Sequence, residues 1–488
     1  SNTCSDECKC ICISVSFKVN KSSKSLIVKL EDFISAMIAG QTCLNFCLSI
    51  HPSSLNVSQV HMGSGDPYTP GLPKILAQTI PTSMADVMRS GLYLYQIFLY
   101  IIKVDVGNVL TEKKISNVFG VIKGFVDPDR YVVIGAQRDA WGPGFAASTV
   151  GTTQLMLIWF LVTDGFKPRR SIVFVSWTAG EYGNVGATEW LEGYLSSLSL
   201  KAFAYINLDA VVTGQDRFKV AASPLMHSLI ETTVSKVQFP ISCFSLTQLM
   251  PLQMNDAAYP FVAFSGIPSL SFRFNSDRDH YSFFGTALDT QDNLNTAAAG
   301  KVPELAEVAT RFAGHMVLRL VHDHLLRFDL KKYNKIIKVQ VKPMPLNHCC
   351  VCVFSEAAPE AARGPDGAVV ELGLGSYGRA SHDLMTDIQN SNLDDIEMCR
   401  IINDRIMAVE RSFLSPYVSP SDNPFRHILL GSGAHTLKGL INHLDALRAD
   451  NPDADIDAFR NQFALATWTI QGCADSLAGN IWSLDNEI

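Results

Sequence analysis

Residues 131–144, YVVIGAQRDAWGPG, decide the fold together with residues 174–183, FVSWTAGEYG. Each stretch begins as an apolar strand and runs directly into a polar turn that carries glycine and charge. Strands of this kind are typical of an α/β enzyme, in which ligands bind beyond the carboxyl ends of the strands. We therefore expect any functional residues at the two turns that follow these strands.

The chain around these two strands alternates between predicted strands and helices. Strands are expected at residues 118–125, 131–134, 171–177, 202–208 and 269–274, and helices at 150–163, 188–198 and 303–326. Asp127, Pro128 and Asp129 predict a hairpin turn between the first two strands. Ser223 followed by Pro224 predicts a capped helix start. The alternation predicts an α/β fold with a mixed, mainly parallel sheet covered by helices.

The two ends of the chain differ from this middle part. No convincing strand pattern follows Asp329, and amphipathic stripes predict an all-helical bundle over residues 331–488. These stripes are carried by Ile402, Ile406, Val409 and Phe413 and by residues 459–478. Residues 1–56 show no clean periodicity, and we assign them no fold. The apolar residues 92–104 fall short of the roughly 18 to 20 that a membrane span needs, so we expect any anchor outside this chain.

The composition and net charge of the chain indicate which kinds of molecule it can bind. The chain has 488 residues, of which 47% are hydrophobic, which is ample for real cores. A net charge of −7 without any block of lysine and arginine argues against nucleic-acid binding. The 12 cysteines show no zinc pattern, so thiols or disulfides are favoured and the redox compartment stays open. Asn20 and Asn56 begin glycosylation triplets that would be used if the chain is secreted.

Several longer segments carry a resemblance to a known family. They are GSGDPYTPG at residues 63–71, NVFGVIKGF at 117–125, GAQRDAWGPG at 135–144, VGATEWLEGYLSSL at 185–198, AYINLD at 204–209, FLSPYVSP at 413–420, PFRH at 424–427 and ALATWTIQG at 464–472. The set resembles the transferrin receptors, pseudoenzyme relatives of the glutamate carboxypeptidase group of zinc peptidases. The resemblance covers roughly residues 60–90 and 111–488, with poor agreement around 341–378.

The resemblance implies the ectodomain part of a type II membrane protein. Such a cell-surface receptor binds iron-loaded transferrin and carries it into cells by endocytosis, cycling through endosomes. The implied parts are a remnant of the apical domain at residues 57–115, a protease-like domain at 116–330, and a helical dimerisation domain at 331–488 that forms a homodimer. Family sequence is replaced at the start of the chain and around 341–378, which suggests a fragment, an unusual isoform or a faulty gene model.

The same resemblance implies an enzyme site that has lost its chemistry. The related peptidases hold two zinc ions with histidines and carboxylates, and a glutamate takes a proton from the bridging water. A histidine ligand falls on Gln137, the bridging aspartate on Ala147 and the general base on Gly180, while the final histidine falls on Gly285. An amide, a methyl group or a hydrogen cannot fill these roles, so we expect no zinc and no catalytic residue.

Two positions of the emptied site keep a carboxylate. Glu181 and Asp209 stand where metal ligands belong. We expect them to be leftover carboxylates that pair with Arg138 or with backbone amides, because a buried charge must be paired. Arg138 and Asp139 are expected to form a structural ion pair.

A second cation position is better preserved by the resemblance. In the family a calcium-type ion joins the protease-like and apical parts, and its ligands fall on Thr69, the backbone carbonyl of Leu72, Glu189 and Glu192. The two glutamates are three residues apart, so a helix places them on one face, and hard cations prefer oxygen ligands. A solvated acidic helix start is the competing interpretation. We expect no required cofactor, and a structural Ca²⁺ is the one ion that the resemblance allows here.

The transferrin-binding element of the family is the least conserved part of the resemblance. It falls on residues 374–379, where Gly375, Tyr377 and Arg379 persist as candidate ligand contacts. Two other functions stay open. The chain is either a receptor relative or truncated isoform with another ligand or none, or an active zinc peptidase, against which Gly180 and Gly285 argue directly.

Overall fold

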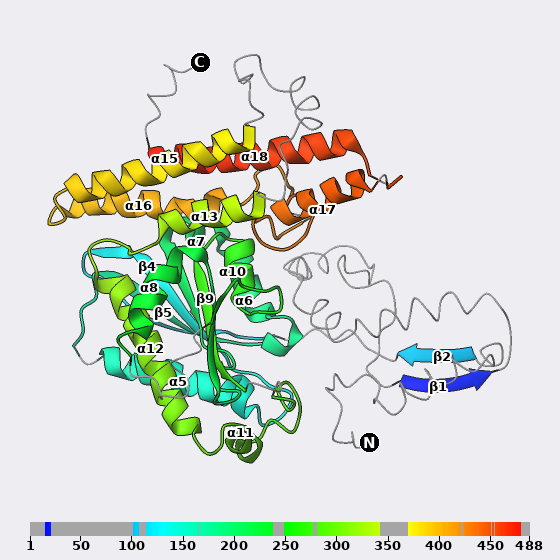
Figure 1. Cartoon of the computed structure of the whole chain (residues 1–488). Coiled ribbons are helices and arrows are strands. Elements are labelled where there is room, and N and C mark those ends of the chain that lie inside the picture. The colour runs from blue at the N-terminus through cyan, green and yellow to red at the C-terminus, as the bar shows by residue number, and fades with distance from the viewer. Residues whose placement is uncertain are drawn as a thin grey trace.

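The computed structural model describes residues 15–20, 101–106, 114–163, 165–237, 248–276, 281–341, 369–420, 423–449, 451–452 and 454–479. It contains a seven-stranded sheet, a helical bundle and a two-stranded sheet (Figure 1). In the two-stranded sheet, β1 (Val15–Asn20) pairs antiparallel with β2 (Ile101–Val106). Among the described helices, none is long and apolar enough to cross a membrane.

The seven-stranded sheet is mixed and mainly parallel, as predicted. Its strands run in the order β3-β5-β4-β6-β9-β7-β8. Their bounds are Val118–Ile122 (β3), Asp127–Gln137 (β4), Arg170–Trp177 (β5), Ala202–Asn207 (β6), Arg217–Ala222 (β7), Gln248–Met250 (β8) and Ser269–Asn275 (β9). β4 pairs parallel with both β5 and β6, β6 with β9, and β7 with β8, whereas β3 with β5 and β7 with β9 are antiparallel. The sequence pattern did not predict β7 or β8.

The predicted hairpin between β3 and β4 is wrong, because β5 lies between these two strands. Ser171, at the start of β5, bonds to the connection between β3 and β4 and to the start of β4. Its hydroxyl accepts a hydrogen bond from the Gly124 amide at 2.9 Å and donates one to the Pro128 carbonyl at 2.7 Å. A turn signal shows that the chain reverses, and it does not show which strands then pair.

Helices cover both faces of the sheet, and alternate side chains of β4 show why. Val132 and Ile134 pack into one cluster of buried residues, and Val133 packs into another on the opposite face. The first face is covered by α5 (Val150–Thr163), α8 (His227–Val234) and α12 (Val302–His322), and the second by α6 (Val185–Gly193), α7 (Leu195–Lys201) and α10 (Tyr259–Ala263). The helix predicted at residues 188–198 is therefore two helices, which meet at Tyr194.

The last third of the chain is helical, as its amphipathic stripes predict. Its helices are α13 (Leu330–Val341), α15 (Val369–Asn390), α16 (Ile396–Ser412), α17 (Leu437–Arg448) and α18 (Ile456–Ala478). The side chains of Asp395, Thr436 and Asp455 accept hydrogen bonds from backbone amides at the starts of α16, α17 and α18. The domain limits at 57–115, 116–330 and 331–488 themselves stay predictions.

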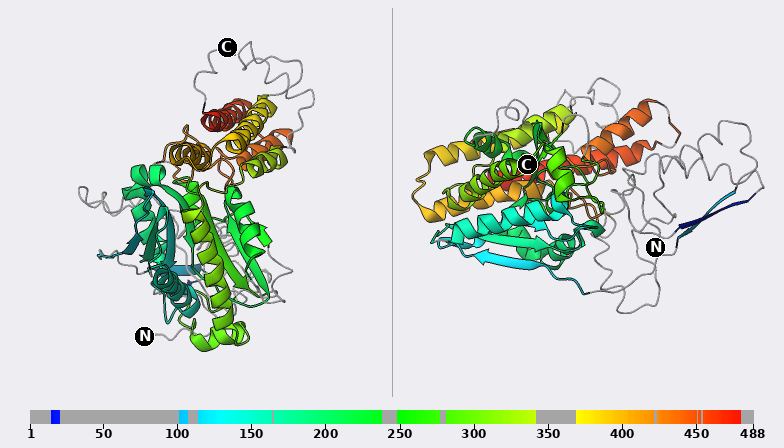
Figure 2. Two further views of the ribbon diagram at one scale, coloured as in Figure 1. Left: turned by 90° about the vertical axis from the view of Figure 1, so that its left-hand side faces the viewer. Right: turned by 90° about the horizontal axis from the view of Figure 1, so that it is seen from below.

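The helical bundle lies at one end of the seven-stranded sheet (Figures 1 and 2). Contacts identify this end as the one where β4 and β6 begin. Arg130, near the start of β4, pairs with Asp404 of α16 at 3.0 Å, and Arg411 donates to the carbonyl of Ala202, the first residue of β6, at 2.7 Å. The carboxyl ends of these strands therefore point away from the bundle.

A fully buried carboxylate joins the sheet to the bundle. Glu410 of α16 accepts hydrogen bonds from Ser223, which follows β7, and from Tyr333 of α13. His427 Nε2 lies 3.0 Å from Glu410, and His427 Nδ1 accepts from the Leu429 amide, so Nε2 carries the proton and donates. Ser223 precedes a 3-10 turn, η5 (Pro224–Met226), but its hydroxyl goes to Glu410 and does not cap that turn as predicted.

Candidate functional site at the strand ends

The candidate site forms where β4, β5 and β6 end side by side. β4 pairs parallel with β5 so that Gln137 lies opposite Trp177, and β6 runs parallel on the other side of β4. The turns that follow these strands carry Asp139, Gly180 and Asp209. The structure therefore brings together residues that are far apart in sequence, at the edge where α/β folds place ligand sites.

Gln137 takes the central place in this site. Its backbone amide donates to Asp209 Oδ1 at 2.6 Å, and its side-chain amide donates to the Asp139 carbonyl at 2.9 Å. The side chain also lies against Gly180, where an added Cβ would come within 2.4 Å of Gln137 Cδ. A side chain at 180, the predicted position of the general base, would therefore require the Gln137 side chain to move.

Asp139 organises the turn after β5. One carboxylate oxygen accepts the Gly180 amide at 2.8 Å, and the other accepts the Glu181 amide at 3.1 Å. These bonds hold η4 (Gly180–Tyr182), which begins after Ala179 in the left-handed region at φ 53°. The predicted ion pair of Asp139 with Arg138 is not the arrangement found, because Arg138 donates to the Ser116 carbonyl at 2.6 Å. Both residues follow the end of β4, and the Asp139 carboxylate is instead engaged by the amides of the turn after β5.

Glu181 is a carboxyl group whose pKa is raised to about 7. Burial is the main cause, the charge of Asp139 adds to the rise, and a hydrogen bond from Gln137 opposes it. Gly285, the predicted position of the final histidine, lies beside it, since a Cβ on Gly285 would be 4.0 Å from Glu181 Oε2. Gly285 has φ +69°, a conformation that a histidine would adopt only with strain.

Asp209 is the second surviving carboxyl group, and its pKa is also raised to about 7. Burial causes the rise, and the hydrogen bond from the Gln137 amide opposes it. Asp209 thus has a backbone amide as its partner, as predicted for the leftover carboxylates. In the part of the chain that the structure describes, no group of three or more His, Cys, Asp or Glu side chains is arranged to hold a metal.

Asp289 is a site residue that the sequence did not reveal. It is 1% exposed and accepts hydrogen bonds from the amides of Ala146 and Ala147 at 3.0 Å and from the Tyr281 hydroxyl at 3.0 Å. The two amides belong to the first turn of η3 (Phe145–Thr149), so this carboxylate caps the turn on which Ala147 lies. Asp289 is 142 residues from Ala147 along the chain, and no local pattern connects them.

The predicted calcium-type ligands are described in part. Glu189 and Glu192 lie on α6, and both are half-buried. Burial raises the pKa of both carboxyl groups, and the charge of Glu189 adds to the rise at Glu192, whose pKa is about 7. The two glutamates are three residues apart on one helix, so their carboxylates lie on the same face, where oxygen ligands of a hard cation can converge. Thr69 and Leu72 lie outside the described residues.

The predicted ligand contacts on α15 divide into surface and core. Arg379 is exposed, and its guanidinium lies over Gly375, where an added Cβ would be 3.2 Å from Nη1. Tyr377 is fully buried, donates its hydroxyl to the Leu330 carbonyl at 2.9 Å and packs against Phe413. The prediction that Tyr377 contacts the ligand is therefore wrong. Tyr377 lies on the inner face of α15, and its side chain is part of the core of the bundle.

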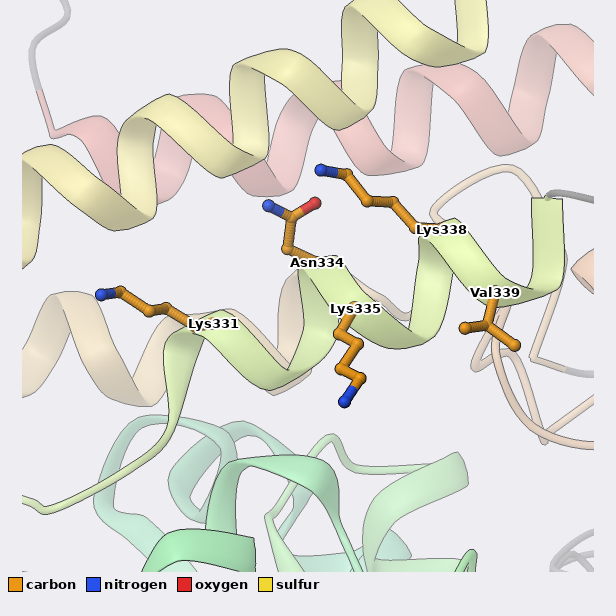
Figure 3. Close-up of a pocket in the computed structure, with 5 residues that line it drawn as sticks. All are labelled: Lys331, Asn334, Lys335, Lys338 and Val339. Atoms are coloured by element: carbon orange, nitrogen blue, oxygen red, sulfur yellow. The ribbon is translucent and has the colours of Figure 1, made fainter.

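An open cavity of about 380 Å³ lies along α13, in the bundle (Figure 3). It is lined by Lys331, Asn334, Lys335, Lys338 and Val339. Its lysines give it a positive lining, unlike the acidic groups at the strand ends. The cavity is therefore separate from the candidate site.

Comparison with known proteins gives two family matches. Residues 117–310 match peptidase family M28, and residues 378–478 match the transferrin receptor-like dimerisation domain. A zinc aminopeptidase from Bacillus subtilis is a similar solved structure, with 18% identity, a TM-score of 0.39, and coverage of 49% of this chain and 58% of that chain. A likeness of that degree carries no argument about the site.

Curated relatives match most of the chain. Transferrin receptor protein 1 of Gallus gallus is 40% identical over 486 residues, and transferrin receptor protein 2 of Mus musculus is 40% identical over 488 residues. Each match covers 88% of this chain and 60% of the relative, so the chain spans about 60% of the length of these proteins. The chain is a transferrin receptor-like protein, in which a peptidase family M28 domain is followed by a helical dimerisation domain.

Proposed function

We propose that the chain is ectodomain sequence of a cell-surface receptor for iron-loaded transferrin, which enters cells by endocytosis and cycles through endosomes. The observation that carries the proposal is the 40% identity to both transferrin receptor proteins 1 and 2 over 88% of the chain. Such a receptor is a type II membrane protein. The matching dimerisation domain supports a homodimer that forms through the helical part.

Binding of transferrin is the direct test. The purified chain is immobilised and exposed to iron-loaded and iron-free transferrin at neutral and at acidic pH. We expect saturable binding of the iron-loaded form at neutral pH. Loss of binding under every condition would instead favour a receptor relative or truncated isoform with another ligand or none. Burial of Tyr377 favours that alternative, because Gly375 and Arg379 are then left at the predicted contact.

The peptidase-like domain is proposed to have no peptidase activity. Gln137 fills the space beside Gly180, so a general base cannot be restored there without moving the glutamine. Loss of a general base costs roughly 10²- to 10⁴-fold in rate, and the lost ligand positions remove the zinc that would activate water. Soaking in zinc followed by elemental analysis should give no stoichiometric metal, and peptide substrates should stay uncleaved. Tight binding of zinc together with cleavage of the peptide substrates would show that the chain is an active zinc peptidase.

A structural Ca²⁺ is proposed at Glu189 and Glu192, with Thr69 and Leu72 completing its ligands. Support comes from the two half-buried carboxyl groups on one face of α6, whose mutual repulsion a cation would relieve. Calcium should raise the unfolding temperature of the wild-type chain and leave that of the double variant Glu189→Gln, Glu192→Gln unchanged. Equal responses of the two proteins would favour the solvated acidic helix.

A further inference from the structure

The cavity along α13 has a positively charged lining. Its volume is about 380 Å³, and it is lined by Lys331, Asn334, Lys335, Lys338 and Val339 (Figure 3). Positions with this spacing lie along one side of a helix, because neighbouring turns bring them together. Among the described residues, no acidic side chain lines the cavity. We call this site the α13 cavity.

The three lysines of the α13 cavity are charges that no described carboxylate neutralises. Lys332, which is outside the lining, pairs with Glu231 at 4.0 Å. Among the ion pairs of the described residues, none includes Lys331, Lys335 or Lys338. Like charges three or four residues apart on a helix repel each other. An anion bound along this side of α13 would relieve the repulsion.

The spacing of the lysines indicates the shape of the anion. Lys331 and Lys338 are seven residues apart, which is about 10 Å along the helix axis, and Lys335 lies between them. A ligand with several negative groups can pair with all three lysines at once, whereas a single small ion reaches fewer of them. The cavity volume of about 380 Å³ is near the lower end of the range for small-molecule sites, about 300–1,000 Å³. The favoured ligand is therefore a compact polyanion.

The two uncharged residues of the lining suit a ligand that also has a carbon skeleton and hydroxyl groups. Val339 presents an exposed apolar side chain. Asn334 Oδ1 is buried and has no hydrogen-bond partner among the described residues, while Nδ2 lies against Gly378 of α15, where an added Cβ would be 2.8 Å away. A turn of the amide group would let a ligand hydroxyl donate to Oδ1, which removes the cost of an unpaired buried acceptor.

We propose that the α13 cavity binds a compact, hydroxyl-bearing polyanion with two or more sulfate or phosphate groups. Its negative groups pair with the three lysines, and its skeleton and hydroxyl groups contact Val339 and Asn334. The chain as a whole carries a net charge of −7, so a polyanion is held here by the local cluster and not by the overall charge. Transferrin has no part in this binding, which therefore goes beyond the receptor function.

Isothermal titration calorimetry of the full chain tests the proposal with two probes. One is a sulfated heparin disaccharide, and the other is myo-inositol hexakisphosphate. At least one of them should bind saturably, and added salt should weaken the binding, because the lysines are exposed. Sucrose, which has hydroxyl groups and no charge, should not bind. The probe that binds more tightly shows whether sulfate or phosphate is preferred.

Two variants of α13 locate the binding. The double variant Lys331→Gln, Lys338→Gln removes two charges of the lining and keeps a similar helix propensity. It should weaken the binding about tenfold, since an exposed ion pair is worth up to about fivefold in affinity. Lys332→Gln removes a lysine of the same helix that is outside the lining, and it should bind as the wild type does. Circular dichroism checks that both variants are folded.

Three results would overturn the proposal. Absence of saturable binding by both probes would favour lysines that are merely solvated. Unchanged binding by the double variant would place the site elsewhere. Equal weakening by Lys332→Gln and by the double variant would show attraction to the charge of the whole helix. If the double variant does not fold, Lys338→Gln alone carries the test. None of these results bears on the receptor function, whose test uses transferrin.

Discussion

Gln137 and Gly180 form a matched pair at the emptied site. The glutamine fills the volume that a side chain at 180 would need, and its two amide groups bond to Asp209 and to the Asp139 carbonyl. Restoring a single catalytic residue would therefore disturb the packing before it restored chemistry. The site has become a scaffold whose polar groups bond to one another and to the backbone.

Gly180→Ala should lower the free energy of unfolding by about 1–3 kcal/mol, the usual cost of overpacking. The added Cβ would lie within 2.4 Å of Gln137 Cδ. The cost should largely vanish when Gln137→Ala is present, because that change removes the obstructing atoms. Urea denaturation of the four proteins of this cycle measures the coupling. Gly314→Ala, where the Cβ meets nothing within 4 Å, is the control. Equal costs in both backgrounds would contradict the pairing.

Glu181 should make the protein less stable as pH rises towards neutrality. Its pKa is raised from 4.5 to about 7 in the folded state, so the folded chain binds more protons than the unfolded chain between these values. Stability is then fully present below about pH 4.5 and falls as pH rises to about 7. Glu181→Gln should therefore stabilise the protein at pH 8 and not at pH 4. Thermal unfolding across this range measures the difference, and a pH-independent effect would contradict the burial argument.

At the scale of elements, Glu410 is the buried link between sheet and bundle. Its carboxylate accepts from Ser223, Tyr333 and His427. Glu410→Ala leaves all these donors unpaired in the core, so the free energy of unfolding should fall by about 3–5 kcal/mol. Glu307→Ala, which breaks the exposed pair with Arg311, should cost less than about 1 kcal/mol. Chemical denaturation measures both, and similar losses would show that Glu410 does not carry the junction.

β3 is the end strand of the described sheet and carries exposed apolar side chains. Val121 is 57% exposed, whereas Phe119 on the same face packs against Trp177 and Trp190. An exposed apolar edge strand promotes association between chains. Val121→Lys should reduce light scattering on heating and change stability by less than about 0.5 kcal/mol. Phe119→Lys should lower stability, and an unchanged scattering of Val121→Lys would rule out the edge as the cause.

Helices and strands could be predicted from the sequence where a local pattern of apolar residues determines them. The apolar run of β5 and the stripe of α16 were visible in sequence, because burial imposes periods of 2 and 3.6 residues. Pairing was not visible, since β3 and β4 follow each other along the chain and yet each pairs with β5, which comes after both. The place of the candidate site was also predictable, because it lies at the ends of strands that the sequence reveals. Asp289, which belongs to the same site, was not predictable. Its role is to cap a distant turn, and such a role has no signature of its own.

The helical bundle and the degenerate site lie at opposite ends of the strands of the seven-stranded sheet. The bundle contacts the strands where β4 and β6 begin, through Arg130 and Arg411, whereas the degenerate site lies where these strands end. Among the described residues, the packed core of the sheet lies between the two regions. Under the proposed receptor function, ligand binding belongs to the bundle and should be insensitive to the carboxyl groups at the strand ends.

Arg379→Glu should weaken binding of iron-loaded transferrin at least about tenfold, because it reverses an exposed charge at the predicted contact. Glu181→Gln should leave the affinity unchanged, since Glu181 lies at the other end of the sheet. Surface plasmon resonance at neutral pH compares these variants with Arg311→Glu, a charge reversal on α12 that should also be silent. If Glu181→Gln weakens binding as much as Arg379→Glu, the strand ends take part in recognition, and the separation of scaffold and binding surface must be abandoned.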